Sequence, residues 1–336
     1  MSSQAKAQAS ILSIEGLSVE FTDRQGRSVK AVRDVSLSVE KGEMVAVVGE
    51  SGSGKTALGM SIVRLLPEAG RITSGNVFFD GQDLSAAGDR ELRAVRGKRI
   101  GVVFQDPMSS LNPYLTVGRQ IAEAVELHLG LSRRDAREHA KELLDVVGIS
   151  DPEKRVDQYP HEFSGGMRQR VMIAIAVSCK PDLVIADEPT TALDSTVQAQ
   201  VLDLLDELRA KIGMSIILIS HDLALVSGRA DRVAVMYGGR IFEEAKAAEL
   251  FTRTANPYTR ALLAAMPENA NAGDELYQIP GMPPDLRVDA EACEFAPRCD
   301  RAEAVCSERR PPFAAVSSTH FSRCHFADKV FHKGKG

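Results

Sequence analysis

The sequence predicts an α/β fold with a mostly parallel central sheet over about residues 11–240. The first observation is that short β-branched runs alternate with amphipathic helical patterns along this stretch. Such alternation is typical of strands joined by helical crossovers. The second is that several runs are apolar without interruption, as in strands buried on both faces. These runs are residues 44–48, 100–104, 183–186 and 216–219.

Helical periodicity appears between and after these strands. Apolar residues at 197, 201, 204, 205 and 208 share one helix face, which predicts a helix after Thr196. Ser132 opens the run SRRD, a typical N-cap, and we expect a long helix from there to near Gly148. Residues 106–178 are polar and helix-periodic, so we interpret them as a helical subdomain inserted into the α/β core.

Composition limits the class of protein. A length of 336 residues suggests about two domains, and 44% hydrophobic with 26% charged residues is ordinary for a globular chain. A net charge of -5 argues against binding to nucleic acid. No apolar run approaches the ~18 residues that span a bilayer, and no signal peptide is visible. We therefore expect a cytosolic chain with reduced thiols and a disordered N-terminus at residues 1–10.

Residues 49–56 match the phosphate-binding motif G-x-x-x-x-G-K-[ST] between a predicted strand and a predicted helix. The glycines allow backbone N–H groups to face phosphate oxygens, and the helix dipole adds to this. A turn with a chance lysine is the competing interpretation, which the full match disfavours. We predict that ATP and Mg²⁺ bind here, with Lys55 on the β- and γ-phosphates and Thr56 on the metal. The predicted loop residues are Gly49, Glu50, Ser51, Gly52, Ser53, Gly54, Lys55 and Thr56.

Two acidic residues, Asp187 and Glu188, follow the apolar run at 183–186. The carboxyl ends of parallel strands lie at the edge where open α/β sheets bind ligands. Asp187 therefore suits the Mg²⁺ shell, and Glu188 suits the water that attacks the γ-phosphate. Taken alone, such a pair is more often a strand end or a helix cap, but the phosphate loop favours the functional interpretation.

Further motifs resemble those of ABC ATPases. Residues 163–167, FSGGM, resemble the LSGGQ signature, just upstream of the acidic pair. The other family positions are Gln105 (Q-loop), Ala192, Leu193 and Asp194 (D-loop) and His221 (switch histidine). The similarity covers roughly residues 11–250 and implies an ABC ATPase domain over residues 11–256, with the helical subdomain at about 106–178.

The resemblance implies roles for these residues. ABC ATPases hold ATP between two subunits, so Ser164, Gly165 and Gly166 are expected to contact the γ-phosphate bound to a second chain. Met167 replaces the glutamine of many signatures, at little cost because the phosphate ligands are a hydroxyl and helix-start amides. The remaining assignments are Gln105 and His221 as catalytic with Glu188, Gln105 also as a Mg²⁺ ligand, Asp194 at the nucleotide, and Phe21 stacking on adenine.

Longer segments are similar to the ATPase subunits of oligopeptide and dipeptide permeases: QDPMSSLNP at 105–113, then FSGGMRQRVMIAIA, NPYTRALLAAMP, IPGMPP and the C-terminal cysteines. This resemblance implies an importer ATPase for peptides or a related small solute, peripheral at the cytoplasmic face of the inner membrane. The implied partners are a second homologous ATPase, as a heterodimer, two transmembrane permease subunits and an extracytoplasmic solute-binding protein. The alternative is a soluble ABC ATPase of the repair, chromosome or translation type.

The C-terminal extension, residues 257–336, contains Cys293, Cys299, Cys306 and Cys324 in the pattern C-x₅-C-x₆-C-x₁₇-C. The close cysteine pairs of zinc fingers are absent, and a reduced cytosol disfavours disulfides. Four thiolates can hold a [4Fe–4S] cluster, and the permease resemblance implies one. Structural zinc and free thiols are the alternatives.

The rest of the extension is rich in proline and poor in apolar residues, so we expect an irregular subdomain that folds around a metal and is remote from the ATP site. Residues 269–273 (NANAG) are interpreted as a linker. His320 and His325 flank Cys324 and are alternative ligands, although two surface histidines are the plainer interpretation. Cys179 follows an apolar run and is expected to be a buried, unreactive side chain.

Overall fold

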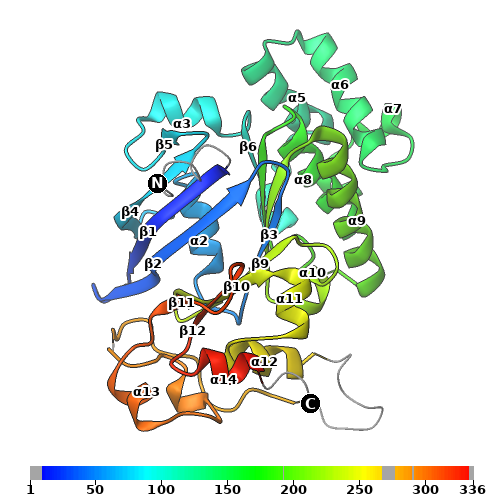
Figure 1. Ribbon diagram of the computed structural model, residues 1–336. Helices are drawn as coiled ribbons and strands as arrows, with labels where there is room; N and C mark the ends of the chain where they lie inside the picture. The colour runs from blue at the N-terminus through cyan, green and yellow to red at the C-terminus, as the bar shows by residue number, and fades with distance from the viewer. Residues whose placement is uncertain (1–9, 192, 267–276, 290, 333–336) are drawn as a thin grey trace. The chain divides into compact units, whose positions relative to one another are not determined.

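A computed structural model describes residues 10–191, 193–266, 277–289 and 291–332 (Figure 1). These residues form two compact units. Unit 1 contains Val39–Glu43 and Ala86–Ile219, together with the start of the first strand. Unit 2 contains the described residues of Leu12–Ser38, Met44–Ser85 and Ser220–Gly336. Of the residues 1–10 predicted to be disordered, 1–9 lie outside the described residues and Ser10 begins the first strand. The predicted linker at 269–273 also lies outside the described residues.

Unit 1 is built on parallel strands in the order β8-β7-β6. The strands are β6 (Ile100–Val103), β7 (Leu183–Asp187) and β8 (Ser215–Ser220). The register places Ile100 beside Leu183 and Asp187 beside Ile219. Every residue of β7 and β8 is buried, which confirms the expectation drawn from their uninterrupted apolar runs.

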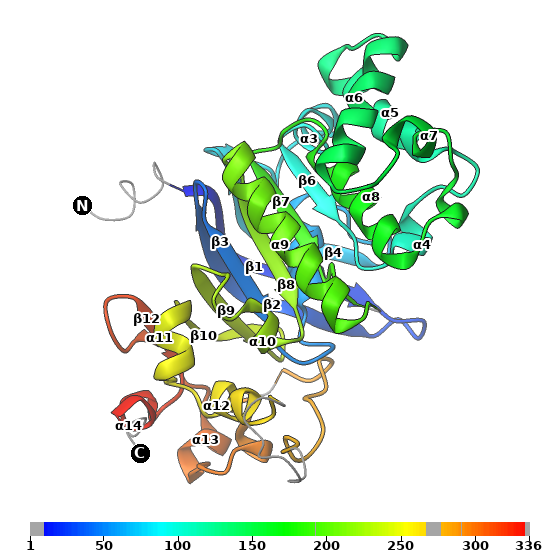
Figure 2. The same ribbon diagram turned by 90° about the vertical axis from the view of Figure 1, so that its right-hand side faces the viewer.

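The helices of unit 1 include those predicted from periodicity and caps. They are α3 (Asp89–Val95), α4 (Pro107–Ser110), α5 (Val117–Leu129), α6 (Arg133–Val146), α7 (Pro152–Arg155), α8 (Gly165–Val177) and α9 (Ser195–Ile212), with a 3₁₀ turn at Pro160–Glu162. Ser132 caps α6 by accepting a hydrogen bond from the Asp135 N–H at 3.2 Å. In Figure 2, α8 lies against β6 and α9. Residues 107–177 are therefore mainly helical, as the sequence predicts, and they share unit 1 with β6–β8.

Unit 2 contains an antiparallel sheet and a mixed one. The first has the order β2-β1-β4-β5: β1 (Ser10–Thr22), β2 (Ser28–Glu40), β4 (Gly70–Phe79) and β5 (Gln82–Asp83). The second has the order β11-β12-β10-β9-β3: β3 (Met44–Val48), β9 (Arg232–Tyr237), β10 (Arg240–Lys246), β11 (Phe313–Ala315) and β12 (His320–Arg323). Strand β3 runs parallel to β9, and the other pairs of this sheet are antiparallel.

The C-terminal extension is less irregular than expected. Its strand β12 pairs with β10, with Ser322 opposite Glu243, and so continues the sheet that contains β3, β9 and β10. Both views show α12, α13 and α14 gathered beside these strands (Figures 1 and 2). The helices of unit 2 are α2 (Lys55–Ile62), α10 (Leu223–Val226), α11 (Ala247–Thr252), α12 (Pro257–Ala264), α13 (Ala304–Glu308) and α14 (Ala327–His332), with a 3₁₀ turn at Ala296–Arg298.

Within the described ranges, no helix combines the length and the apolar character that a membrane crossing requires.

Candidate functional site

The predicted phosphate loop connects β3 to α2, as its motif requires. Its first and last glycines are held close to neighbouring backbone. A Cβ atom on Gly49 would lie 2.1 Å from the Met236 carbonyl oxygen, and one on Gly54 would lie 2.1 Å from the Ala31 carbonyl oxygen. Both glycines also have positive φ, 151° and 103°. Glycine is therefore required at both positions to bring the loop against β9 and β2.

Replacing Gly54 by alanine is expected to lower the free energy of unfolding by about 1–3 kcal/mol more than the same change at Gly26. Gly26 is the matched control because it also has positive φ, 79°, but has no atom within 4 Å of the added Cβ. Both variants carry the strain of a left-handed residue, and only Gly54→Ala adds the collision. Urea denaturation compares them, and equal losses would show that the close approach at Gly54 is tolerated.

Two side chains of the loop face inward. Lys55 is 4% exposed, and its Nζ donates to the carbonyl oxygens of Gly49 at 2.8 Å and Glu50 at 3.0 Å. The Ser53 hydroxyl is buried and has no hydrogen-bond partner within the part of the chain that the structure describes. A buried polar atom without a partner is destabilising unless a ligand satisfies it. The loop therefore has the donors and the cationic group that a phosphate requires.

The acidic pair ends β7 as predicted. Asp187 is 3% exposed, and Glu188 adopts a left-handed backbone with φ 45°. Such a conformation costs a non-glycine residue roughly 1–3 kcal/mol and occurs mainly where surrounding contacts enforce it, often at functional sites. The Glu188 N–H donates to the Ile219 carbonyl at 2.9 Å, which holds the backbone. The strand end thus presents the Glu188 carboxylate in an orientation that an ordinary strand residue would not have.

Gln105 and Glu188, predicted separately, are brought together. The Gln105 Nε2 donates to Glu188 Oε2 at 3.2 Å. The Thr191 hydroxyl donates to the same oxygen at 2.9 Å. Sequence reasoning missed Thr191, although its spacing of three residues after Glu188 was a usable signal for a turn contact. The carboxylate is therefore oriented by an amide and a hydroxyl.

Ser164 caps α8 by accepting a hydrogen bond from the Met167 N–H at 3.4 Å, which confirms the predicted helix start. Ser164 and Gly165 are exposed. A Cβ on Gly166 would lie 2.8 Å from Val197 Cγ1. The packing of α9 against α8 therefore leaves no room for a side chain larger than that of glycine at this position. Asp194 caps α9 through the Val197 N–H at 3.1 Å. Ala192, part of the predicted D-loop, lies outside the described residues.

The other predicted residues fall in unit 2 with the phosphate loop. Phe21 pairs with Gly70 of β4, and its ring lies over that glycine, where a Cβ would come within 2.6 Å of Phe21 Cε1. His221 is exposed just after β8, and Thr56 is exposed at the start of α2. Gln105, Ser164, Asp187, Glu188 and Asp194 belong to unit 1.

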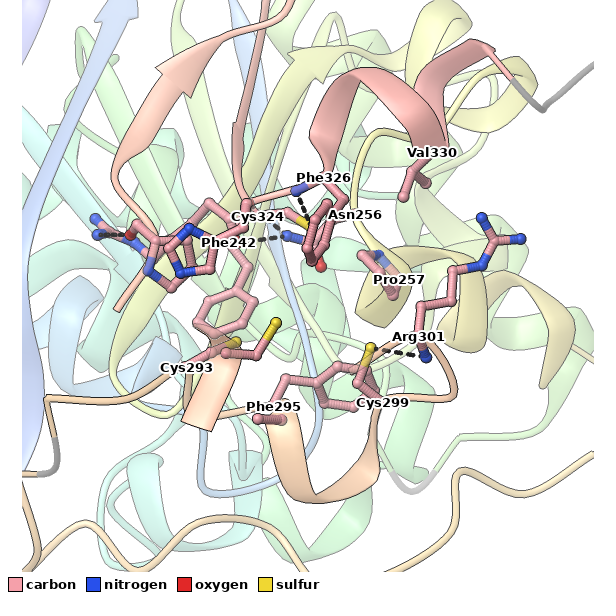
Figure 3. Close-up of a pocket in the computed structure, with 15 residues that line it drawn as sticks. Phe242, Asn256, Pro257, Cys293, Phe295, Cys299, Arg301, Cys324, Phe326 and Val330 are labelled. Carbon is pink, nitrogen blue, oxygen red and sulfur yellow. Dashed lines mark hydrogen bonds between the residues drawn. The ribbon is translucent and has the colours of Figure 1, made fainter. Parts of the chain in front are cut away.

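The four cysteines of the extension line one cavity (Figure 3). The cavity is otherwise mainly apolar, with lining residues that include Phe242, Pro257, Phe295, Phe326 and Val330. Burial raises the pKa of the Cys293 thiol to about 12 and that of Cys324 to about 11. All four are free cysteines. In the described ranges, no three His, Cys, Asp or Glu side chains form a group that could hold a single metal ion.

The histidines near Cys324 differ from expectation. His320 is fully buried, and its Nε2 contacts Glu243 Oε1 at 2.6 Å. The interpretation of His320 as a surface residue is therefore wrong, because β12 carries it into the sheet. His325 lines the cysteine cavity, and its Nε2 contacts the Arg309 carbonyl oxygen at 2.8 Å. Cys179 is buried, as predicted.

The extension is not remote from the phosphate loop, contrary to expectation. Arg298, which lies between Cys293 and Cys299, forms an ion pair with Glu50 of the loop at 2.6 Å. Tyr258 of α12 accepts a hydrogen bond from the Glu50 N–H at 3.0 Å. These residues are far apart in sequence but close in space, because the chain returns to the end of β9, where Arg298 donates to the Tyr237 hydroxyl.

Two family models match this chain, one over the region of the phosphate loop and one over much of the C-terminal extension. A family model described as "ABC transporter" matches residues 32–191, and one described as "Oligopeptide/dipeptide transporter, C-terminal region" matches residues 242–306. The chain is 46% identical to the "Probable peptide ABC transporter ATP-binding protein y4tR" of Sinorhizobium fredii, over 98% of each chain. It is 49% identical to the "Oligopeptide transport ATP-binding protein OppD" of Bacillus subtilis, over 93% of this chain and 87% of that one.

Solved structures show the same similarity for the ATPase part. A dimeric ATP-binding cassette, MJ0796, described as a post-hydrolysis state bound to ADP and Pi, is 27% identical with a TM-score of 0.63. The match covers 70% of this chain and 98% of that one. The cassette cbiO1 of Clostridium perfringens is 28% identical with a TM-score of 0.61, over 72% of this chain and 91% of that one. The α/β fold predicted from the sequence is therefore confirmed.

Proposed function

Since this chain belongs to the ABC transporter ATP-binding proteins, in the oligopeptide and dipeptide permease family, we propose that it hydrolyses MgATP at the phosphate loop and Glu188 to drive the uptake of peptides or a related small solute. The observation that carries this assignment is the joint match to the ATPase family and to the transporter C-terminal region. The soluble ABC ATPase is disfavoured because nearly the whole chain matches ATP-binding proteins of peptide transport.

The phosphate loop is proposed to bind the β- and γ-phosphates. The inward Lys55 and the unpartnered Ser53 hydroxyl support this assignment, as does the left-handed backbone at the loop glycines. Thr56, Gln105 and Asp187 are proposed to hold Mg²⁺, which when bound neutralises the charge that develops on the phosphates. Phe21 is proposed to stack on adenine, and the exposed His221 to contact the γ-phosphate.

Glu188 is proposed to orient the water that attacks the γ-phosphorus and to accept its proton. The hydrogen bonds from Gln105 and Thr191 support this role because they fix the direction of the carboxylate. Since Gln105 donates to Glu188 directly, any movement of the segment that follows Gln105 would also alter the hydrogen bonding of the catalytic carboxylate.

The helical residues at about 106–178 are proposed to act as the inserted helical subdomain of the ATPase domain at 11–256, with 257–336 as the permease-type extension. The exposed Ser164 and Gly165, with Gly166, are proposed to complete the ATP site of a second homologous ATPase, as a heterodimer. Asp194 is proposed to lie at the same interface. Two transmembrane permease subunits and an extracytoplasmic solute-binding protein complete the assembly, which places this chain peripherally at the cytoplasmic face of the inner membrane.

Permease contact is expected at the segment after Gln105. Met108 is 64% exposed and Tyr114 is 87% exposed, and large apolar side chains exposed in one segment favour an interaction surface. Cysteine introduced at Ser110 or Asn112 is expected to crosslink to a cytoplasmic helix of the permease. The matched control is cysteine at Asp203, on the exposed face of α9. Exclusive crosslinking through residues of the extension would contradict the assignment.

Cys293, Cys299, Cys306 and Cys324 are proposed to bind a [4Fe–4S] cluster. The fit is supported by four thiols lining one apolar cavity. Each iron of such a cluster takes its own thiolate, so the sulfur atoms need not converge on one point as they must around a single ion. Burial raises the pKa of three of the thiols, Cys293, Cys299 and Cys324, so they ionise only with a compensating positive charge. Structural zinc is the alternative.

Reconstitution tests the proposed function. Proteoliposomes containing this chain, its partner ATPase and the permease are expected to hydrolyse ATP faster when the binding protein and a peptide are present on the opposite side. The control omits only the binding protein. ATP hydrolysis that does not depend on the permease or on peptide would instead favour the soluble class.

A further inference from the structure

We propose that Arg298 of the C-terminal extension is a positioning residue for ATP binding: it holds Glu50, and through Glu50 the phosphate loop, in the conformation that receives the phosphates. The proposal rests on the assignment of residues 49–56 as the ATP phosphate site. Arg298 and Glu50 both belong to unit 2. They are 248 residues apart in sequence.

The contact between the two side chains is bidentate. Arg298 Nη1 donates to Glu50 Oε2 at 2.6 Å, and Nη2 donates to Oε1 at 2.8 Å. The Arg298 side chain is 3% exposed and that of Glu50 is 24% exposed. Paired guanidinium and carboxylate groups fix both distance and orientation, which a lysine cannot reproduce. Because the arginine is buried, solvent competes little for this pair.

Arg298 itself is held in one orientation. Besides Glu50, its Nε donates to the Pro280 carbonyl at 2.8 Å, Nη1 to the Tyr237 hydroxyl at 3.2 Å, and Nη2 to the Ile279 carbonyl at 3.3 Å. A guanidinium has five N–H donors, and these contacts with the two to Glu50 use all of them. An arginine whose N–H donors all have acceptors has a fixed position, so it can in turn fix the position of Glu50 in the loop.

The extension holds the Glu50 backbone as well. The Tyr258 hydroxyl accepts from the Glu50 N–H at 3.0 Å. The Tyr258 ring is fully buried and packs on Tyr237 and Phe295, with ring centroids 4.4 and 5.2 Å apart. Phe295 begins the short segment that ends in Arg298. One buried aromatic cluster therefore anchors both groups that contact Glu50.

Glu50 connects this anchor to the lysine of the loop. Its carbonyl oxygen accepts from Lys55 Nζ at 3.0 Å. The Glu50 N–H that Tyr258 holds belongs to the same peptide unit as the Gly49 carbonyl oxygen, which accepts from Lys55 Nζ at 2.8 Å. The extension therefore orients a peptide unit that Lys55 contacts. A loop rich in glycine and serine loses much conformational freedom when it closes on a ligand. Prior ordering by Arg298 lowers that cost, and the benefit appears as tighter binding.

The test measures MgATP binding to the full chain, by displacement of a fluorescent ATP analogue, and steady-state ATPase kinetics. Arg298→Gln is expected to raise the Kd and the KM for ATP by about tenfold and to leave kcat within about twofold, because saturating ATP still orders the loop. Arg298→Lys is expected to fall between wild type and Arg298→Gln. Arg287→Gln is the matched control, since Arg287 is an exposed arginine of the same extension that forms an ion pair with the carboxylate of Asp285.

Two further variants separate the possible failures. Lys55→Ala tests the site: if it binds ATP as wild type does, the assignment on which the proposal rests is overturned. If Lys55→Ala loses binding and Arg298→Gln does not, the site stands and the positioning role is overturned. The double variant, with Glu50→Gln and Arg298→Gln, is expected to bind ATP with the same affinity as the single variant that binds it less tightly. If the losses of binding free energy in the two single variants instead add up in the double variant, Arg298 does not act through Glu50.

Hydrogen exchange supplies a readout that does not depend on ATP. In Arg298→Lys, which retains the charge and the stem, the amides of residues 49–56 are expected to exchange faster, with no change in α5, α6 or β7. Faster exchange throughout unit 2 would indicate that Arg298 only stabilises the fold, and it would overturn the specific role. Unchanged exchange in the loop would overturn it too.

Discussion

Glu188→Gln is expected to lower the rate of ATP hydrolysis by about two to four orders of magnitude while leaving MgATP binding nearly unchanged. The glutamine has the same shape and still accepts the hydrogen bonds that Gln105 and Thr191 donate. It cannot accept the proton of the attacking water, however, so chemistry stalls after binding. Single-turnover hydrolysis and size-exclusion chromatography with ATP measure the two effects, and an ATP-bound dimer with the partner ATPase is expected to accumulate.

Two controls make this result specific. Lys55→Ala is expected to weaken nucleotide binding itself, because it removes the cation that faces the phosphates. Thr191→Val removes only one of the two donors to Glu188, so a smaller loss of kcat with unchanged ATP affinity is expected. Hydrolysis by Glu188→Gln at the wild-type rate would show that another group activates the water.

Replacing both Cys299 and Cys306 by serine is expected to abolish the proposed iron–sulfur centre. Anaerobically purified wild-type protein should be brown and contain about four irons per chain, whereas the double variant should be colourless. Because metal binding is coupled to folding in a segment with so few apolar residues, the extension should become sensitive to protease. Iron analysis, absorbance and limited proteolysis measure these changes, with Cys179→Ser as the matched control.

The structure also alters what this variant should do to ATP binding. Arg298 directly precedes Cys299, so loosening the cysteine segment is expected to weaken ATP binding by no more than Arg298→Gln does. A colourless wild-type preparation with one zinc per chain would exclude the iron–sulfur cluster and keep a structural metal. An extension that is ordered without any metal would exclude both.

Several parts of the molecule could be predicted from local sequence pattern alone. The strand at 44–48 and the helix start at Ser132 were predicted at the residues where they occur, because strand burial and helix capping depend on near neighbours in the chain. The phosphate loop was predicted for the same reason: its glycines, lysine and threonine lie within eight consecutive residues, and their spacing is the motif.

Contacts between distant segments were not predictable in this way. Thr191 and Gln105 both contact Glu188, but nothing in either segment specifies that Gln105, 83 residues away, reaches the same oxygen. The left-handed backbone of Glu188 has no sequence signal either, since glycine is the usual residue there. The neighbouring strand β8, which is distant in sequence, holds the Glu188 N–H through the Ile219 carbonyl oxygen.

The sequence by itself therefore determined the α/β class, the phosphate loop, the acidic pair and the grouping of the four cysteines. Tertiary structure alone decided that β12 continues the sheet, that His320 is buried beside Glu243, and that Arg298 binds Glu50. The physical reason is that periodicity and motifs record interactions between near neighbours. An arginine in a proline-rich segment has the same local pattern whether it is solvated or buried, and only the return of the chain to the phosphate loop gives it a partner.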